Sequence, residues 1–284
     1  MRALGSPVLS TAEAPSIRPV PPAWVEALVS EDASFSLLSR RLLHPPDAHA
    51  DEFAEAIAAL YRSMAEELAR EHRHAVRIWN FVPDIQGPID GAGDRYMAFN
   101  AGRFNAYADW LGGAPAFDRT VPTSSAVGIS EDLFAMHVLA ATVPGEHVEN
   151  PRQIPSYQYS RRYGFRPPCF ARATKLPPRL LIGGTASILG EHSQHGGDLE
   201  AQTRETFQNL AALLTAAEPT PSRRPLDALR SLRVHVRDAA DGAAVRSLID
   251  GLAPHVRDIE VVHSPLCRKE LLVEVEGVAE LHAS

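Results

Sequence analysis

The chain has 284 residues, of which 45% are hydrophobic and 22% charged, and its formal net charge is −7. This size and composition are typical of a soluble globular protein with one large or two small domains. The negative charge argues against general binding to nucleic acid or to an acidic membrane surface, and no apolar run is long enough to span a membrane. Cys169 and Cys267 form neither a metal-binding spacing nor a disulfide framework, which favours a reduced, cytoplasmic protein.

The first half of the chain predicts a tail followed by helices and strands. Residues 1–20 contain several Pro and Ser and lack the apolar core of a signal peptide, so we expect a flexible N-terminal tail. The clearest helix covers residues 47–72, because its apolar residues recur on one stripe. The other expected elements are a helix over residues 95–110 and strands over residues 34–43, 75–82, 124–129 and 133–143.

The segment from residue 144 to residue 178 interrupts this pattern. It holds seven prolines, and arginines alternate in it with tyrosines and phenylalanines. A stretch of this length with little regular structure is usually a binding loop. Guanidinium groups bind carboxylates and phenols bind hydroxyls or ring faces, so the composition suits a ligand with carboxylates and a ring. A solvated face that pairs with the protein's own carboxylates explains the same residues equally well.

The second half repeats the element order of the first. A strand over residues 180–189 contains Gly183 and Gly184, and glycines inside a strand usually mark a bulge or a close approach. The elements that follow are helices over residues 198–216 (with Asp198 as N-cap) and 242–252, and strands over 232–236, 259–262 and 271–275. We therefore predict an α/β fold of two similar units, each a mixed sheet with helices packed on one side. The predicted domains are residues 21–150 and 151–284, although recurrence of a common motif would give the same order.

Two places in the pattern could carry chemistry. Strand alternation puts Glu274 and Glu276 on the face opposite the apolar one. In a partly apolar site between the domains Glu274 would have a raised pKa and could donate a proton near neutrality, but the pattern alone favours a solvent-exposed edge strand. Gly102 lowers the stability of its predicted helix; either a close approach near Arg103 requires it, or the helix tolerates it.

Metal chemistry finds little support. His192 and His195 lie in one polar turn, but the spacing supplies no third and fourth ligand. We therefore predict no metal site. The chain also has no phosphate-binding loop and none of the common hydrolase motifs.

Several longer motifs lie in order between residues 95 and 277. They are Val148-Glu149-Asn150-Pro151-Arg152-Gln153, Ser156-Tyr157, Tyr163-Gly164-Phe165-Arg166-Pro167-Pro168, Phe170-Ala171-Arg172-Ala173, Gly184-Thr185-Ala186-Ser187-Ile188, Ser193-x-His195-x-Gly197-Asp198, Gln202-Thr203-x-Glu205-Thr206-x-x-Asn209 and the segment Cys267–Glu274. Together they resemble the motifs of the chorismatase family.

This resemblance implies a fold similar to that of the RidA/YjgF proteins and an enzyme that cleaves chorismate and releases pyruvate, without a redox cofactor or a metal. Glu274 matches the family's catalytic glutamate, a general acid that protonates the enolpyruvyl methylene. Cys267 matches a position that is Cys in members making 3-hydroxybenzoate and Ala in members that add water. The resemblance therefore favours 3-hydroxybenzoate, with 4-hydroxybenzoate as a second product, in a monomer or homotrimer. The implied substrate-binding groups are Arg103, Tyr157, Arg162, Arg172 and the backbone near Gly183.

One position departs from the family pattern. Glu191 stands where members usually have His, and its carboxylate either repels an anionic substrate or points to solvent. Two alternatives stay open: a non-catalytic RidA-like protein that binds a small molecule, and a chorismatase that gives the dihydroxycyclohexadiene carboxylate.

Overall fold

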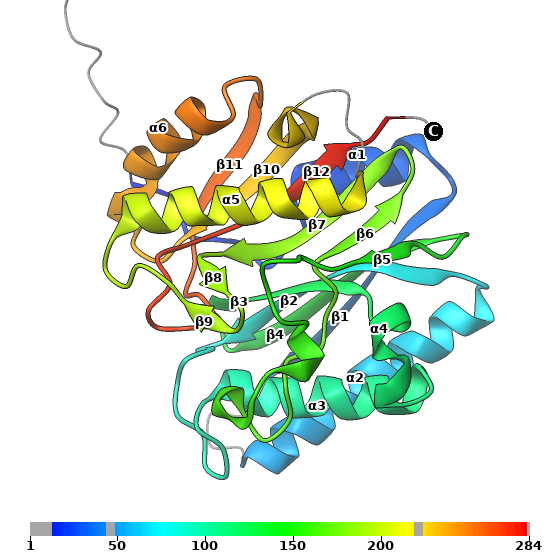
Figure 1. Ribbon diagram of the computed structural model, residues 1–284. Helices are drawn as coiled ribbons and strands as arrows, with labels where there is room; N and C mark the ends of the chain where they lie inside the picture. The colour runs from blue at the N-terminus through cyan, green and yellow to red at the C-terminus, as the bar shows by residue number, and fades with distance from the viewer. Residues whose placement is uncertain (1–12, 44–48, 219–223, 283–284) are drawn as a thin grey trace, which may run out of the picture.

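The computed structural model describes residues 13–43, 49–218 and 224–282. Two β-sheets face one another in the middle, and helices cover the outer face of each sheet (Figure 1). The order of layers is therefore helices, sheet, sheet, helices. The inner faces of the two sheets are buried against each other, and the candidate site lies in this central layer.

The first unit is built on a four-stranded sheet with the order β1-β4-β2-β3. β4 pairs antiparallel with β1 and β2, and β2 pairs parallel with β3. α2 and α3 pack on the outer face, and α1 packs against the inner face. The elements are α1 (Ala23–Glu31), β1 (Phe35–Leu43), α2 (Ala50–Arg70), β2 (His74–Pro83), α3 (Arg95–Trp110), η1 (Ala114–Ala116), α4 (Phe117–Thr120), β3 (Thr123–Ile129) and β4 (Leu133–Ala141).

The second unit is built on a six-stranded sheet with the order β11-β10-β12-β7-β6-β5. β10 and β11 pair parallel and the other neighbours pair antiparallel, while α5 and α6 cover the outer face. The elements are β5 (Glu146–Val148), η2 (Ser156–Gln158), η3 (Arg161–Tyr163), β6 (Ala173–Leu176), β7 (Arg179–Ala186), β8 (Ile188–Leu189), β9 (His192–Ser193), α5 (Leu199–Ala217), η4 (Pro225–Ala228), β10 (Leu229–Val236), η5 (Ala239–Asp241), α6 (Gly242–Leu252), β11 (Asp258–His263) and β12 (Val273–Glu280).

Each strand of the first sheet has a counterpart in the second sheet, which adds β6 and β5. β4 lies between β1 and β2, and β2 pairs parallel with β3; in the same way β12 lies between β7 and β10, and β10 pairs parallel with β11. The order β1-β4-β2-β3 thus corresponds to β7-β12-β10-β11. The predicted α/β fold of two similar units, with mixed sheets and helices on one side, is confirmed.

Apolar side chains hold the two sheets together. The central cluster joins α1 and the inner faces of both sheets, and its largest member, Trp79, is 2% exposed. Burial of apolar surface stabilises such an interface by about 25 cal/mol per Å². Polar side chains that share this layer are therefore held in fixed positions with little water around them.

The structure corrects several local expectations. Residues 13–20 do not behave as a tail, because the backbone N–H of Ala14 and of Ile17 donates to the carbonyls of Ala239 and His263; residues 1–12 lie outside the described residues. α1 was missed because its 9 residues bury only two side chains, Val25 and Leu28. Such a short apolar face gives a weak periodic signal.

Two further expectations concern the residues around the site. β12 is an interior strand between β10 and β7, so the expected solvent-exposed edge strand is wrong. At Gly102 a Cβ atom would lie 2.3 Å from the carbonyl oxygen of Ala54 in α2, so this glycine lets α2 and α3 approach each other closely. The segment 144–178 contributes β5 and β6 at its two ends, and η2 and η3 lie between them.

Candidate active site

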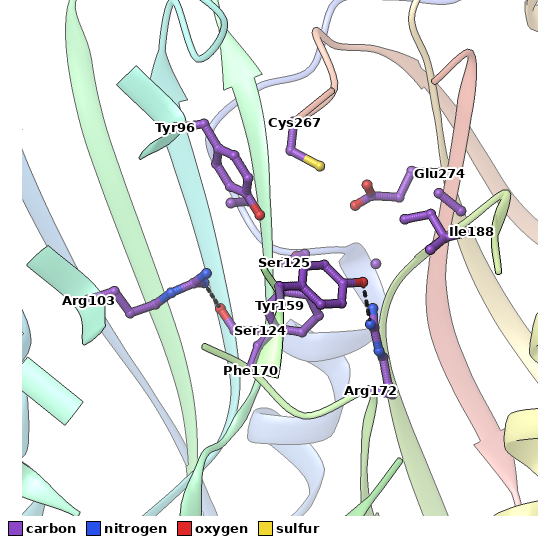
Figure 2. Close-up of a pocket in the computed structure, with 13 residues that line it drawn as sticks. Tyr96, Arg103, Ser124, Ser125, Tyr159, Phe170, Arg172, Ile188, Cys267 and Glu274 are labelled. Carbon is purple, nitrogen blue, oxygen red and sulfur yellow. Dashed lines mark hydrogen bonds between the residues drawn. The ribbon is translucent and has the colours of Figure 1, made fainter. Parts of the chain in front are cut away.

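A narrow cavity lies between the two sheets, below the connection from β11 to β12 (Figure 2). Both units and the segment between β5 and β6 contribute to its wall. Its polar lining consists of two guanidiniums, one carboxyl, one thiol, two phenols and two hydroxyls. The lining residues are Tyr96, Arg103, Ser124, Ser125, Ala126, Tyr159, Phe170, Arg172, Gly184, Ala186, Ile188, Cys267 and Glu274.

Glu274 is the carboxyl group of this cavity. β12 places it opposite Ala186 of β7 and His235 of β10, on the face that points away from the helices. The side chain fits because its neighbour is Gly184: a Cβ atom at that position would lie 2.1 Å from Oε1 of Glu274. Glu274 is 5% exposed, and this burial, together with the nearby charge of Glu276, raises the pKa of Glu274 to about 7. The carboxyl can therefore hold a proton at neutral pH and release it within the cavity.

Glu276 lies two residues further along the same face of β12, outside the cavity lining. Its Oε2 accepts hydrogen bonds from the Arg77 guanidinium and from the Ser125 hydroxyl (2.8 Å), and its Oε1 accepts one from the indole N–H of Trp79 (3.2 Å). Burial alone would raise the pKa of this carboxyl, but Arg77 and His235 lower it to about 2. Glu276 is therefore a fixed negative charge behind the cavity.

His235 lies opposite Glu274 on the neighbouring strand and close to Glu276. Its Nδ1 lies 3.1 Å from Oγ of Ser264, and its Nε2 lies 3.6 Å from Oε1 of Glu276. The imidazole is 1% exposed and stands beside Glu274 across the β10–β12 pair. Because His235, Glu274 and Glu276 are on the neighbouring strands β10 and β12, strand register sets their relative positions.

Arg103 brings a positive charge into the cavity from α3. Its guanidinium is 0% exposed; it donates to Oδ1 of Asn100 (2.8 Å) and Oγ of Ser124 (3.2 Å), and it lies 4.7 Å from the centre of the Phe99 ring. Its Nε has no hydrogen-bond partner, and among the described residues no carboxylate oxygen lies within 4.0 Å of the guanidinium. A buried charge without a counter-ion is costly, so this arrangement favours an anionic ligand.

Arg172 provides a second guanidinium from the start of β6. It donates to the hydroxyl of Tyr159 (2.7 Å) and to the carbonyl of Ile154 (3.1 Å), and its Nε lies 3.8 Å from Oε2 of Glu149. That distance is too long for a hydrogen bond, and the buried Nε has no hydrogen-bond partner. Arg172 and Arg103 thus approach the cavity from different units with unused N–H donors.

Cys267 and Tyr96 lie beside each other at one end of the cavity (Figure 2). Burial, with the charge of Glu274, raises the pKa of the Cys267 thiol to about 12. Burial also raises the pKa of the Tyr96 phenol. Both groups are therefore neutral at physiological pH, and neither can serve as an anionic nucleophile.

Polar residues on α5 hold the walls of the cavity in place. The side-chain amide of Asn209 donates to the carbonyls of Ala186 and Ile188 (both 2.9 Å), and its oxygen accepts a hydrogen bond from Arg152 (2.6 Å). Gln202 accepts from the backbone N–H of Leu272 (2.8 Å), just before β12. These contacts fix the ends of β7 and β12, which carry Gly184 and Glu274.

Comparison with known proteins assigns the chain to a family. A sequence model described as "Chorismatase FkbO/Hyg5-like, N-terminal" matches residues 27–140. A 3-hydroxybenzoate synthase from Streptomyces hygroscopicus is 33% identical over an alignment 290 positions long, and the alignment covers 93% of this chain and 83% of that protein. A chorismatase from Streptomyces rapamycinicus is 32% identical over 239 residues, which cover 80% of this chain and 70% of that protein. The chain belongs to the chorismatase family.

The fold of this chorismatase agrees with that assignment. A solved chorismatase structure aligns with 86% of the chain at 28% sequence identity and a TM-score of 0.75, and the alignment covers 74% of that structure. A smaller solved protein of the YjgF/YER057c/UK114 family from Mycobacterium tuberculosis aligns with 39% of the chain at a TM-score of 0.32, which is too weak to bear on function. None of the helices in the described residues is long and apolar enough to cross a membrane.

The structure brings together four of the residues singled out from the sequence: Glu274, Cys267, Arg103 and Arg172 all line the cavity. Other candidates lie outside this lining. Tyr157 packs edge-on against Phe117 and His147 (both 6.3 Å between ring centres), and Arg162 lines a neighbouring hollow. The backbone N–H of Gly183 donates to the carbonyl of Arg172 (2.9 Å), and the adjacent Gly184 is the glycine that lines the cavity.

Glu191, the departure from the family pattern, does not line the cavity. Its carboxylate accepts a hydrogen bond from the backbone N–H of Ser160 (2.7 Å), which lowers the pKa of Glu191. This contact joins the β8–β9 hairpin to the start of η3. The carboxylate therefore has a structural partner, and its negative charge does not face the ligand space.

Sequence reasoning missed several lining residues, among them Tyr96, Tyr159, Ser124 and Ser125. The adjacent hydroxyls Ser124 and Ser125 in a fully buried strand were a usable signal, because buried polar groups need partners. Sequence reasoning named Glu276 but missed the basic side chains near it, whose signal was the alternation of polar residues along β2 and β10: Arg77, Arg233 and His235. Within the described residues, no group of three His, Cys, Asp or Glu side chains is placed to hold a metal ion.

Proposed function

We propose that this chorismatase converts chorismate into 3-hydroxybenzoate and pyruvate, with Glu274 as the general acid. The observation that carries the proposal is the pairing, in one buried cavity, of a carboxyl group with a pKa of about 7 and a guanidinium that has no carboxylate partner among the described residues. The first group can donate a proton at neutral pH, and the second requires an anion. The relatives named 3-hydroxybenzoate synthase and chorismatase support the same substrate.

Arg103 and Arg172 would bind the substrate. Chorismate has a ring carboxylate and an enolpyruvyl carboxylate, and each of these guanidiniums has a buried N–H without a hydrogen-bond partner. Charge-assisted hydrogen bonds of this kind are among the strongest in proteins. The rings of Phe170 and Tyr159 line the same cavity and could pack against the substrate ring. The two arginines approach from different units, so binding would orient the substrate against Glu274.

Glu274 would protonate the methylene carbon of the enolpyruvyl group. The ether carbon then becomes electrophilic and the ring C–O bond can break. The neighbouring ring hydroxyl displaces the pyruvyl group, its proton returns to the Glu274 carboxylate, and the resulting oxide aromatises. Hydroxybenzoate and pyruvate together contain every atom of chorismate, so the reaction balances without water, and Glu274 regains the proton it donated.

Cys267 would favour this intramolecular route by filling space. A neutral thiol at this wall leaves less room for a water molecule beside the substrate ring than a methyl group would. Because its pKa is about 12, the thiol is protonated and would not attack the substrate. Replacing Cys267 with Ala should therefore shift part of the product toward the dihydroxycyclohexadiene carboxylate.

The test is to incubate the purified protein with chorismate, follow pyruvate by a coupled assay and identify the ring product by chromatography. Pyruvate together with 3-hydroxybenzoate is the expected result. Pyruvate with the diene diol would keep chorismate cleavage and overturn the role of Cys267. Intact chorismate with no pyruvate would overturn the proposal in favour of a binding protein that retains the pocket.

A further inference from the structure

A second hollow, of about 310 Å³, lies directly next to the cavity that contains Glu274. The segment around η3 forms one wall, and the connection from β11 to β12 forms another. The first turn of α3 completes it. The lining residues are Gln86, Asp94, Tyr96, Met97, Arg162, Tyr163, Cys267, Arg268, Lys269 and Glu270.

This hollow concentrates positive charge in a protein that is negative overall. Three cations line it, Arg162, Arg268 and Lys269, and Lys269 is one of only two lysines in the whole chain. The two carboxylates in the wall accept local hydrogen bonds: Asp94 from the backbone N–H of Met97 (2.8 Å) and Glu270 from the Ser193 hydroxyl (2.8 Å). The wall has three positive and two negative side chains, whereas the formal net charge of the whole chain is −7.

The three cations differ in how they are held. The Arg268 guanidinium lies 4.0 Å from the centre of the Tyr163 ring and donates to the carbonyl of Glu191 (2.9 Å), so it is part of the wall. Arg162 and Lys269 are exposed, and within the described residues neither forms an ion pair. The Arg162 guanidinium lies 6.0 Å from the centre of the Tyr163 ring, and without a carboxylate partner among the described residues both side chains can turn toward an anion in the hollow.

The hollow and the cavity share two lining residues, Tyr96 and Cys267. One layer of side chains thus separates an open basic space from the buried Glu274. The Tyr96 ring packs on Phe99 (6.4 Å between ring centres, 23° between planes), which supports it from the α3 side.

We infer that this basic hollow is a docking site for small carboxylate anions and the route by which they reach the cavity past Tyr96 and Cys267. The identity of the anion as chorismate rests on the proposed function above; the charge of the site and its connection to Cys267 do not. Clustered charges of one sign raise the local concentration of an oppositely charged ligand and its association rate, and salt screens this effect.

The kinetic test uses the double variant Arg162→Gln/Lys269→Gln. At low ionic strength its kcat/KM for chorismate should fall about 5–10-fold, with a smaller change in kcat, and the decrease of kcat/KM with added salt should flatten. The matched control is Arg204→Gln, which removes an exposed arginine that pairs with Glu200 on α5 and lines neither space. Wild-type kcat/KM and salt dependence in the double variant would overturn the inference.

A second test does not depend on chorismate. Cys267 lines the hollow, whereas Cys169 is 0% exposed, so at alkaline pH, where more of the thiol is ionised, a small alkylating reagent in the hollow should modify Cys267 first. The anion iodoacetate and the neutral iodoacetamide react by the same chemistry, and their rate ratio reports local attraction for a carboxylate independently of thiolate content. In the double variant the ratio of the iodoacetate rate to the iodoacetamide rate should be about threefold lower or more at low salt. The variant Cys267→Ser measures the alkylation that occurs at other residues. An unchanged ratio would show that the hollow does not attract carboxylates, whether or not the protein cleaves chorismate.

Discussion

Glu274 and Glu276 lie on the same face of one strand, two residues apart, yet their surroundings give them opposite properties. Glu276 accepts hydrogen bonds from Arg77, Ser125 and Trp79, and its pKa is lowered to about 2. Glu274 forms no ion pair with any of the described residues and faces a cavity, and its pKa is raised to about 7. Burial is nearly equal at the two positions, so hydrogen bonding and charge neutralisation make the difference.

This contrast explains how a buried carboxyl group is kept protonated at neutral pH. A carboxylate that is fully satisfied inside a protein stays ionised and acts as a fixed charge. A second buried carboxylate without partners of its own retains its proton because burial disfavours its charged form, and the negative charge of its neighbour adds to this effect. Pairs of groups whose surroundings drive their pKa values apart are typical of acid–base sites. The Glu276 cluster therefore supports the acidity of Glu274 as well as the contact between the sheets.

The largest expected effect comes from Glu274→Gln. The amide keeps the shape of the side chain but cannot donate the proton, so pyruvate release from chorismate should fall about 10²–10⁴-fold. The coupled pyruvate assay measures this loss. Activity within threefold of the wild type would show that another group donates the proton, and that Glu274 and Glu276 do not differ in the way that their pKa values indicate.

The same variant should become relatively more stable at high pH, which separates lost chemistry from lost folding. A carboxyl whose folded pKa lies above its unfolded value stabilises the protein fully below the unfolded pKa and loses that contribution as pH rises through the folded pKa. For Glu274 this window runs from about 4.5 to 7. Between pH 5 and pH 8 the wild type should therefore lose up to about 3 kcal/mol that Glu274→Gln keeps, measured by urea unfolding at both pH values.

The next largest effect is expected for Glu276→Gln, which removes the fixed charge and leaves the Arg77 guanidinium buried without its partner. Breaking a buried ion pair typically costs about 3–5 kcal/mol, and urea unfolding at pH 7 measures it. The double variant Arg77→Met/Glu276→Gln removes both charges and should recover part of this loss. A single variant as stable as the wild type would show that the Arg77–Glu276 pair does not hold the sheets together.

The pH dependence of turnover should give a smaller, graded effect. The acid must be protonated, so kcat should be constant below pH 6 and should fall about tenfold per pH unit well above pH 7. The charged or titratable groups near Glu274 are His235 on β10, Glu276 on β12, Arg77 on β2 and Arg172 before β6. The profile should also be measured for His235→Gln, which removes the imidazole opposite Glu274: a fall that persists there assigns the pH dependence to Glu274, and its disappearance contradicts that assignment.

The fold was largely predictable because its signals are local. Apolar periodicity located α2, and α6 runs over the predicted residues Gly242–Leu252. The repeated order of elements anticipated the repeated topology. The location of β12 inside a sheet could not be read from its sequence, because alternation shows two faces but does not show what covers the second one. In this fold the other unit covers the second face of β12, and this contact joins residues that are far apart in the sequence.

The candidate site was predictable in part, and the domain boundary at residue 150 stays a prediction. Strand alternation pointed to Glu274, the glycine in its helix to Arg103 and the composition of residues 144–178 to its arginines, but only the family motifs favoured the catalytic role of Glu274 and singled out Arg172 and Cys267; all four side chains line the cavity. Tyr96 and Ser124 were missed because each lies in an ordinary helix or strand and becomes a wall residue only when the two units meet. The low pKa of Glu276 depends on Arg77, which is 199 residues away in the sequence.

A third carboxylate, Glu191, extends the comparison of Glu274 and Glu276 to a site where the expected effect is smallest. Glu191, like Glu276, has a lowered pKa because it accepts hydrogen bonds, here from Ser160, but it lies near the surface, where water screens charges. Its contribution is present above the unfolded pKa and is lost as pH falls through the lowered folded value. Glu191→Gln should therefore cost less than about 1 kcal/mol by urea unfolding at pH 7, and kcat/KM for chorismate should stay within about threefold of the wild type, since the carboxylate does not line the cavity. A large rise in kcat/KM would instead show that the charge of Glu191 repels the substrate, so that its distance from the cavity is not enough to screen it.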